Sequence, residues 1–294
     1  MKLTNRAIIT KGSITAANTT YYEQQGFLIA RNLLSKEEIR QLMDETIAIF
    51  RGERGAVEGL IPVYSDQGDD EVLKKYTAIH FPHKISPLIF NILRHRKITR
   101  ILSDLTSANV KCMQSMLFVK GPGKAGQSWH QDEYYIPTRD KSLTGAWIAL
   151  DEADQENGCL WVIPGSHREG YIRRRMSYTG KEYADTDTCD IRPYTEKSDA
   201  LPLPAKSGDV VFFHGYLLHR SLRNRSKNRF RRALVNHYMS AESMLPWDWD
   251  GRLPLKEDMR DIVMVAGNDP YQGKGTENLT KPYLRPEIVE IKKD

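Results

Sequence analysis

After Asn109 the chain is divided by turn signals into short apolar runs, and this punctuation limits the fold more than any other feature of the sequence. Residues 110–119 alternate in a way that predicts a strand, with Cys112, Gln114 and Met116 on one face. Further strands are expected at residues 145–150, 158–163, 209–213 and 233–238. Many short strands between glycine-, asparagine- and proline-rich turns are typical of an all-β sandwich or barrel.

The first third of the chain is predicted to be mainly helical. Ser35 and Glu38 form a capping box, and apolar residues at helical spacing follow up to Phe50. A second helix is expected to begin at Ser86-Pro87, because serine is favoured at the N-cap and proline at the first helical position. The sequence therefore predicts a helical layer in front of the β structure.

Charge and cysteine usage exclude several classes of protein. The 43 basic and 38 acidic residues leave a net charge of +5, which does not identify a nucleic-acid binder. The three cysteines have no CxxC spacing, so we expect reduced thiols and a cytoplasmic location. We expect no membrane partner, because the sequence has no apolar run of about 18 residues, and no signal peptide, because the first 20 residues are polar.

The sharpest chemical motif is Trp129-His130-Gln131-Asp132. In an extended segment, residues two apart point to the same side, so His130 and Asp132 are expected to converge. A His-x-Asp pair with one distant histidine is the donor set of the facial triad that binds Fe(II) and leaves coordination positions open. Alone, the His-x-Asp spacing is a weak signal, because most such pairs are ordinary polar residues.

A distant histidine and an arginine follow at suitable positions. His214 directly follows the predicted strand 209–213, and His219 lies five positions further on. Spacing alone does not decide which of the two is the third metal ligand. Arg231 and Arg232 begin the next strand candidate. A guanidinium matches what a 2-oxoglutarate site needs, because it can bind the far carboxylate of that diacid through two hydrogen bonds.

Five sequence blocks, in order, resemble the phytanoyl-CoA dioxygenase family, which comprises non-haem Fe(II)- and 2-oxoglutarate-dependent oxygenases built on a double-stranded β-helix, or jelly roll. The blocks are Trp129-His-Gln-Asp132, residues 145–150, residues 156–167, residues 208–219 and Arg231-Arg-Ala-Leu234. The resemblance implies a single oxygenase domain that is mainly β with N-terminal helices. Its expected parts are a helical layer with entry strands over about 1–108, a jelly-roll core over about 109–240 and a C-terminal wrap over about 241–294.

The family pattern assigns roles to particular residues. It implies that His130, Asp132 and His219 bind iron, with His219 preferred to His214. It implies that Arg231 binds 2-oxoglutarate, with Arg232 as the alternative. Further contacts to 2-oxoglutarate are implied for Ser221, Trp147, Met116 and Lys75, and Gln114 is a weaker candidate that shares the face of Met116. Core packing explains Trp147 and Met116 equally well.

The resemblance implies a dioxygenase that uses Fe(II), 2-oxoglutarate and O2 to hydroxylate an unactivated C–H bond of a small molecule. The retained Asp132 favours hydroxylation over halogenation, because related halogenases have lost that carboxylate. The alternative is a jelly-roll binding protein whose metal site is not catalytic. Arg220 stands where the family has glycine, and its side chain either alters the substrate pocket or points outward.

Basic runs at residues 173–175 and 220–229 leave the charge of the substrate open. They can attract an anionic substrate or nucleic acid, but a solvated hairpin is the preferred interpretation, and we expect no nucleic-acid partner.

Overall fold

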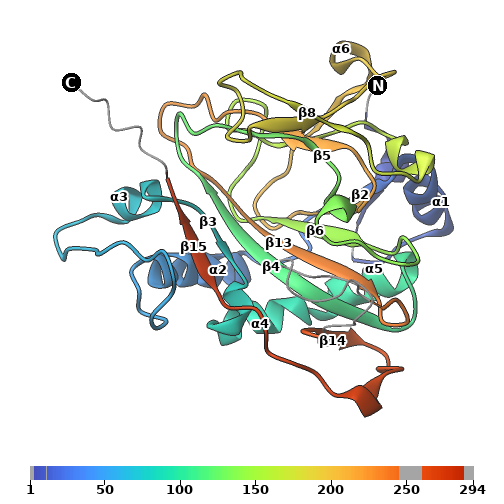
Figure 1. Ribbon diagram of the computed structural model, residues 1–294, viewed down its shortest axis with the longest axis horizontal. Coiled ribbons are helices and arrows are strands. Elements are labelled where there is room, and N and C mark those ends of the chain that lie inside the picture. Colours follow the sequence, from blue (N-terminus) through green and yellow to red (C-terminus); the bar gives the residue numbers. More distant parts are fainter. Residues whose placement is uncertain (1–2, 11, 245–259, 288–294) are drawn as a thin grey trace.

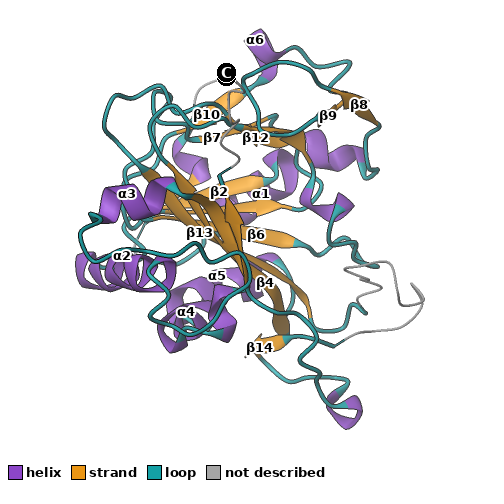
Figure 2. Ribbon diagram, turned by 60° about the vertical axis from the view of Figure 1, so that its left-hand side comes forward, coloured by secondary structure: helices purple, strands orange, loops and turns teal. Residues whose placement is uncertain are grey.

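The computed structural model describes residues 3–10, 12–244 and 260–287. Two β-sheets face one another, and helices cover the outer side of the larger sheet (Figures 1 and 2). This arrangement confirms the predicted jelly-roll architecture, mainly β with N-terminal helices. Across the described residues, no helix is both long and apolar enough to cross a bilayer.

The major sheet has nine strands among the described residues. In spatial order they are β1 (Ile8–Ile9), β2 (Phe27–Ala30), β11 (Val210–His214), β6 (Thr144–Ala149), β13 (Arg231–Ser240), β4 (Val110–Lys120), β3 (Tyr76–His80) and β15 (Tyr283–Pro286), while β14 (Val263–Ala266) also pairs with β4. Strand β13 is buried along almost its whole length, because both faces of the sheet are covered at this position.

The minor sheet lies over the inner face of the major sheet (Figure 2). Its strands, in order, are β10 (Leu201–Leu203), β7 (Leu160–Val162), β12 (His219–Ser221) and β5 (Gln127–His130). A separate two-stranded ribbon, β8 (Arg175–Ser177) with β9 (Asp187–Cys189), covers the end of β5. The 171–205 segment therefore contains three of these short strands and one helical turn.

The helices begin at the residues that the capping signals predicted. Ser35 and Glu38 exchange both capping-box hydrogen bonds at the start of α2, and the Ser86 hydroxyl accepts a hydrogen bond from Ile89 N at the start of α4. The helices are α1 (Ala16–Gln25), α2 (Lys36–Phe50), α3 (Asp69–Lys74), α4 (Pro87–Leu93), α5 (Arg96–Leu105) and α6 (Glu196–Asp199). Short 3-10 turns cover Asn5–Ala7, Pro82–Lys84, Asp132–Tyr134, Ser166–Glu169 and Gln272–Lys274.

Register decides which side chains of β13 and β4 face the space between the sheets. Arg231 pairs with Lys120, Val235 with Met116, and His237 with Gln114. A bulge at Met113 then places Cys112 opposite Tyr238 rather than beside Gln114. The prediction that Cys112 shares the face of Gln114 and Met116 was therefore wrong, because one extra residue in a strand reverses the alternation.

The C-terminal part of the chain is partly described. Residues 245–259 and 288–294 of the predicted wrap lie outside the described residues. The remainder adds β14 and β15 to the edge of the major sheet rather than only passing over the surface (Figure 1).

Candidate active site

Three buried side chains meet where the minor sheet opens toward the major sheet. His130 ends β5, Asp132 begins the following 3-10 turn, and His219 begins β12 directly opposite His130. The Asp132 Oδ1 atom lies 3.7 Å from His130 Nε2 and 3.4 Å from His219 Nε2. The three residues are 4%, 7% and 4% exposed, and their nearest donor atoms lie within 4.8 Å of one another. The two residues predicted to converge in an extended segment do so across a turn.

Backbone carbonyls fix both imidazole rings. His130 Nδ1 donates to Ser128 O at 2.7 Å, and His219 Nδ1 donates to Leu217 O at 2.9 Å. Each ring therefore presents an unprotonated Nε2 toward Asp132 when the imidazole is neutral. Two neutral nitrogens and one carboxylate oxygen within 4.8 Å of one another form a donor set that fits a ferrous ion and leaves coordination positions open.

Gln131, the residue between the two ligand candidates, points the other way. Its amide nitrogen donates to Tyr171 O and Tyr216 O, and its oxygen accepts a hydrogen bond from Arg173 N. It thereby fastens the 171–205 segment to the base of the site.

Burial and charge set the protonation of this group. Burial lowers the pKa of His130 to about 3, and the neighbouring His219 adds to this effect. Burial alone would also lower the pKa of His219, but the Asp132 carboxylate outweighs it and raises that pKa. Burial would raise the pKa of Asp132, yet His219 and His237 hold it well below its ordinary value. Asp132 is therefore an anion throughout the neutral range.

A second polar group lies between the sheets, where β13 begins and β4 ends. Arg231 is 5% exposed, its guanidinium carbon lies 5.8 Å from the Trp147 ring centroid, and its Nε has no hydrogen-bond partner. Lys120 Nζ donates to Ser221 Oγ and to Leu222 O, both at 2.7 Å. Within the described ranges, neither cation forms an ion pair with a carboxylate.

The chemistry of these two buried basic groups suits an anionic ligand. Burial lowers the pKa of Arg231 to about 10, and it lowers the pKa of Lys120 well below the ordinary range, with Arg231 contributing. Two buried charges without counter-ions are costly, and a bound carboxylate removes that cost. Ser221, whose hydroxyl accepts the hydrogen bond from Lys120, lies two residues after His219, so Lys120 contacts the strand that carries His219.

The other predicted cosubstrate residues divide into two groups. Trp147, Met116 and Gln114 occupy inward-facing positions of β6 and β4, near Arg231 or His237. Lys75 Nζ instead donates to Pro62 O and Gln67 Oε1 at the end of α3, and no contact joins it to the two polar groups described above.

Alternation also separates the pairs of candidates that the sequence left open. Arg232 turns to the outer face and forms a bidentate ion pair with Asp151 at 2.8 Å. His214 also faces outward, 5.1 Å from the His167 ring, whereas its neighbour Phe213 lies 4.7 Å from the His219 ring. The geometry thus favours Arg231 and His219.

Arg220 points away from the site. Its guanidinium stacks on Trp129 and Trp161 at 4.6 and 5.5 Å and forms an ion pair with Glu196 at 2.7 Å. The side chain that replaces the family glycine therefore joins α6 to the back of the minor sheet instead of lining the substrate space.

Most of the basic runs are already paired. Arg173 binds Glu169, Arg175 binds Asp187, Arg225 binds Glu182, and Arg229 binds both Asp154 and Glu156. These arginines hold neighbouring segments together and do not form an open cationic surface. This argues against a groove that binds the phosphates of a nucleic acid.

Two partly exposed aromatic side chains lie beside His130. Tyr135 lies 6.3 Å from the His130 ring, and Tyr134 packs edge-on against Tyr135. Both tyrosines are about half exposed, and the Arg175 guanidinium lies over both rings.

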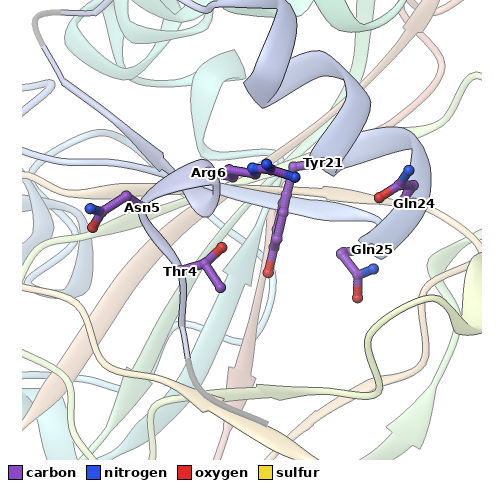
Figure 3. A pocket seen from close by; sticks show the side chains of 6 residues that line it. All are labelled: Thr4, Asn5, Arg6, Tyr21, Gln24 and Gln25. Carbon is purple, nitrogen blue, oxygen red and sulfur yellow. The ribbon is translucent and has the colours of Figure 1, made fainter.

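Two surface hollows lie elsewhere. A hollow of about 400 Å³ beside α1 is lined by Thr4, Asn5, Arg6, Tyr21, Gln24 and Gln25, a polar set without a metal-ligand cluster (Figure 3). A second hollow, of about 490 Å³, lies near Tyr22, Lys141, His214 and Glu242. Neither includes His130, Asp132, His219 or Arg231.

Sequence reasoning missed two residues. His237 was not among the predicted site residues, but its Nε2 donates to Asp132 Oδ2 at 3.0 Å. Lys120 was not considered, although it lies cross-strand from Arg231. The alternation of side chains along a strand could have identified both. Lys120 is an even number of residues after Gln114, Met116 and Phe118, and His237 is six residues after Arg231, so each is expected to share the inward face.

Comparison with known proteins gives a consistent result. The family model described as "Phytanoyl-CoA dioxygenase (PhyH)" matches residues 22–233. Phytanoyl-CoA dioxygenase 1 of Oryza sativa subsp. japonica is 30% identical over 260 residues, covering 79% of this chain and 91% of the relative. Phytanoyl-CoA dioxygenase of Arabidopsis thaliana is 29% identical over 281 residues, covering 84% and 97%. The crystal structure of the non-heme alpha-ketoglutarate-dependent carbocyclase SnoK from nogalamycin biosynthesis superposes with a TM-score of 0.62 at 25% identity, covering 86% of this chain and 97% of that one.

Proposed function

Because this chain belongs to the phytanoyl-CoA dioxygenase family, we propose that its buried His-Asp-His group and its unpaired Arg231 serve the hydroxylation of a C–H bond in a small molecule. The enzyme is an Fe(II)- and 2-oxoglutarate-dependent dioxygenase. When bound, the ferrous ion supplies the redox chemistry that couples oxidative decarboxylation of 2-oxoglutarate to oxidation of the substrate. The overall balance is R–H, 2-oxoglutarate and O2 giving R–OH, succinate and CO2.

His130, Asp132 and His219 are the proposed iron ligands. The two imidazoles donate through Nε2, held in orientation by Ser128 O and Leu217 O. Asp132 donates through Oδ1, the oxygen that faces both rings, and its negative charge offsets part of the charge of the metal.

Arg231 is proposed to bind the far carboxylate of 2-oxoglutarate. Lys120 adds a second positive charge and orients the Ser221 hydroxyl. The Trp147 ring covers one side of the guanidinium and excludes water there, which strengthens the ion pair. The inward positions of Met116 and Gln114 suit them to line the space between this subsite and the iron ligands.

We propose that the substrate enters past Tyr134 and Tyr135. Both rings are about half exposed and Tyr135 lies 6.3 Å from the His130 ring, so they suit contact with an apolar or ring-shaped surface. An anionic substrate remains a proposal, and the basic runs give it no support, because most of their arginines, Arg175 included, are paired with carboxylates. A cytoplasmic location and the three-part division of the single domain also remain proposals.

The observation that carries this proposal is the meeting of three ligand side chains near a buried arginine that has no counter-ion. The test measures binding of Fe(II) and 2-oxoglutarate by anaerobic calorimetry, and then succinate formation with O2. We expect His219→Ala to abolish succinate formation, and His214→Ala to retain it. Binding of both ligands without any succinate, even with a broad substrate panel, would instead support a non-catalytic binding protein.

A further inference from the structure

The two oxygens of the Asp132 carboxylate have different neighbours. Oδ1 faces His130 and His219 at 3.7 and 3.4 Å, whereas Oδ2 accepts a hydrogen bond from His237 Nε2 at 3.0 Å. One oxygen is thus directed at the metal position, and the other is occupied by a donor from the opposite sheet.

The position of His237 is fixed by the architecture of the major sheet. It lies on β13 between Gly145 of β6 and Gln114 of β4, and it faces the interior. Gly145 has no side chain because a Cβ there would come within 2.4 Å of the Phe213 ring, which packs against His219. His237 therefore reaches Asp132 across the space between the sheets. Gly145 leaves room beside it on β6, and the 3-10 turn after β5 brings Asp132 toward it.

We propose that His237 is a positioning residue that holds Asp132 as a ligand through one oxygen. Its Nε2–H engages Oδ2, so the carboxylate presents only Oδ1 to the metal and the adjacent coordination positions stay free. This inference deepens the proposed function and rests on it, because it concerns the same ferrous site. His237 lies beyond the residues that the family model matches.

The physical argument is one of restraint. A carboxylate beside a dication can rotate and bind through both oxygens, which would fill a position that the cosubstrate or O2 requires. A buried hydrogen bond to one oxygen opposes that rotation and keeps the ligand in its orientation before the metal arrives. Removing the donor frees Oδ2 and also leaves it buried without a partner, so both metal affinity and coordination change.

The test compares His237→Phe with His237→Gln in the full chain. Phenylalanine keeps a planar ring but has no donor, whereas the glutamine amide carries an N–H at nearly the reach of Nε2. The measurements are the Fe(II) dissociation constant by anaerobic calorimetry and the visible spectrum of the Co(II)-loaded protein, which reports coordination number. We expect His237→Phe to raise the dissociation constant roughly 10- to 100-fold and to change the Co(II) spectrum. We expect His237→Gln to stay close to the wild-type protein in both.

A matched control separates this role from general packing. His83 is also buried, and its Nδ1 bonds the Ser115 hydroxyl at 2.6 Å, but it does not contact Asp132. His83→Phe should leave both readouts unchanged. Should His237→Phe fail to fold, His237→Asn replaces it, since its amide is too short to reach Oδ2.

The outcomes are distinguishable. A wild-type protein that binds neither Fe(II) nor Co(II) at one site would overturn the proposed function, and this inference with it. With wild-type binding established, the inference is overturned if His237→Phe behaves like the wild type. It is also overturned if Phe, Gln and the His83 control lose metal equally, because packing rather than the donor would then be responsible.

Discussion

At the scale of single residues, two buried basic side chains lack a carboxylate partner at the proposed 2-oxoglutarate site. Arg231 and Lys120 share a buried site, and among the residues described neither has a carboxylate partner. Burying such charges destabilises the ligand-free protein, and it also makes a bound carboxylate more favourable than it would be in water. Stability and cosubstrate affinity are therefore expected to change in opposite directions when one of these cations is removed.

Arg231→Met tests this opposition directly. Because burial lowers the pKa of Arg231 to about 10, an uncharged side chain of similar length should stabilise the ligand-free protein by about 1 to 3 kcal/mol. The same change should weaken 2-oxoglutarate binding about 30-fold or more, since the carboxylate loses its charged partner. Thermal unfolding and calorimetry measure the two effects. Arg232→Gln is the matched control, and weakened 2-oxoglutarate binding in that variant would contradict the assignment.

Glu133 provides a pH-dependent test in the ligand-free protein. Burial, with help from Asp140 and Asp132, raises its pKa from 4.5 to about 7, despite hydrogen bonds from Thr138. A carboxyl with a higher pKa in the folded state binds its proton more tightly there. Its contribution to stability is therefore fully present below about pH 4.5 and is lost as the pH rises through 7.

The difference in unfolding free energy between wild type and Glu133→Gln is expected to change by about 3 kcal/mol across this interval, in favour of the variant at high pH. Urea unfolding at a series of pH values, with a chelator present, measures it. A difference that does not vary with pH would show that Glu133 titrates normally.

At the scale of elements, the 171–205 segment is held against the minor sheet by a few buried contacts. Arg220 stacks on Trp129 and Trp161 and pairs with Glu196, while Gln131 fastens the start of the segment from within the ligand motif. His130 and Asp132 flank Gln131, and His219 precedes Arg220. The proposed iron ligands and the residues that hold the 171–205 segment therefore lie on alternate faces of the same strands.

Arg220→Ala is expected to loosen the segment while the iron ligands stay in place. Loss of the buried stacking and the ion pair should cost about 1 to 3 kcal/mol and increase hydrogen exchange over residues 171–205. Fe(II) affinity should remain near that of the wild type. Arg192→Ala is the control, because Arg192 is highly exposed and its ion pair with Asp190 contributes little. Equal hydrogen exchange over residues 171–205 in both variants would show that Arg220 does not hold this segment in place.

The elements differ in how far the sequence could predict them. The capping box at Ser35, the helices after Ser35 and Ser86, and strands β4, β6, β7, β11 and β13 followed from local patterns, because capping and alternation are local. The β4 bulge and the β14 and β15 pairings did not, because they depend on partners far away in the chain. For the same reason the His-x-Asp motif was visible, whereas the contact between His237 and Asp132, 105 residues apart, was not.

At the scale of the whole molecule, the proposed ligands connect the two sheets. His130 and His219 belong to the minor sheet, whereas Arg231 and Lys120 belong to the major sheet. A 2-oxoglutarate molecule that binds the metal at one end and Arg231 at the other would link them. A ligand that binds only the folded state raises stability in proportion to its binding free energy, so such a link should be measurable as thermal stabilisation.

We therefore expect metal and 2-oxoglutarate to stabilise the protein cooperatively. Fe(II) under anaerobic conditions, or Ni(II) as a redox-inert substitute, should raise the unfolding temperature, and 2-oxoglutarate should raise it further only when metal is present. Arg231→Met should keep the metal increment and lose most of the 2-oxoglutarate increment. His219→Ala should lose both, and a chelator should have the same effect on the wild type. Equal 2-oxoglutarate increments with and without metal would mean that the diacid does not span the sheets, because binding at Arg231 alone requires no ion.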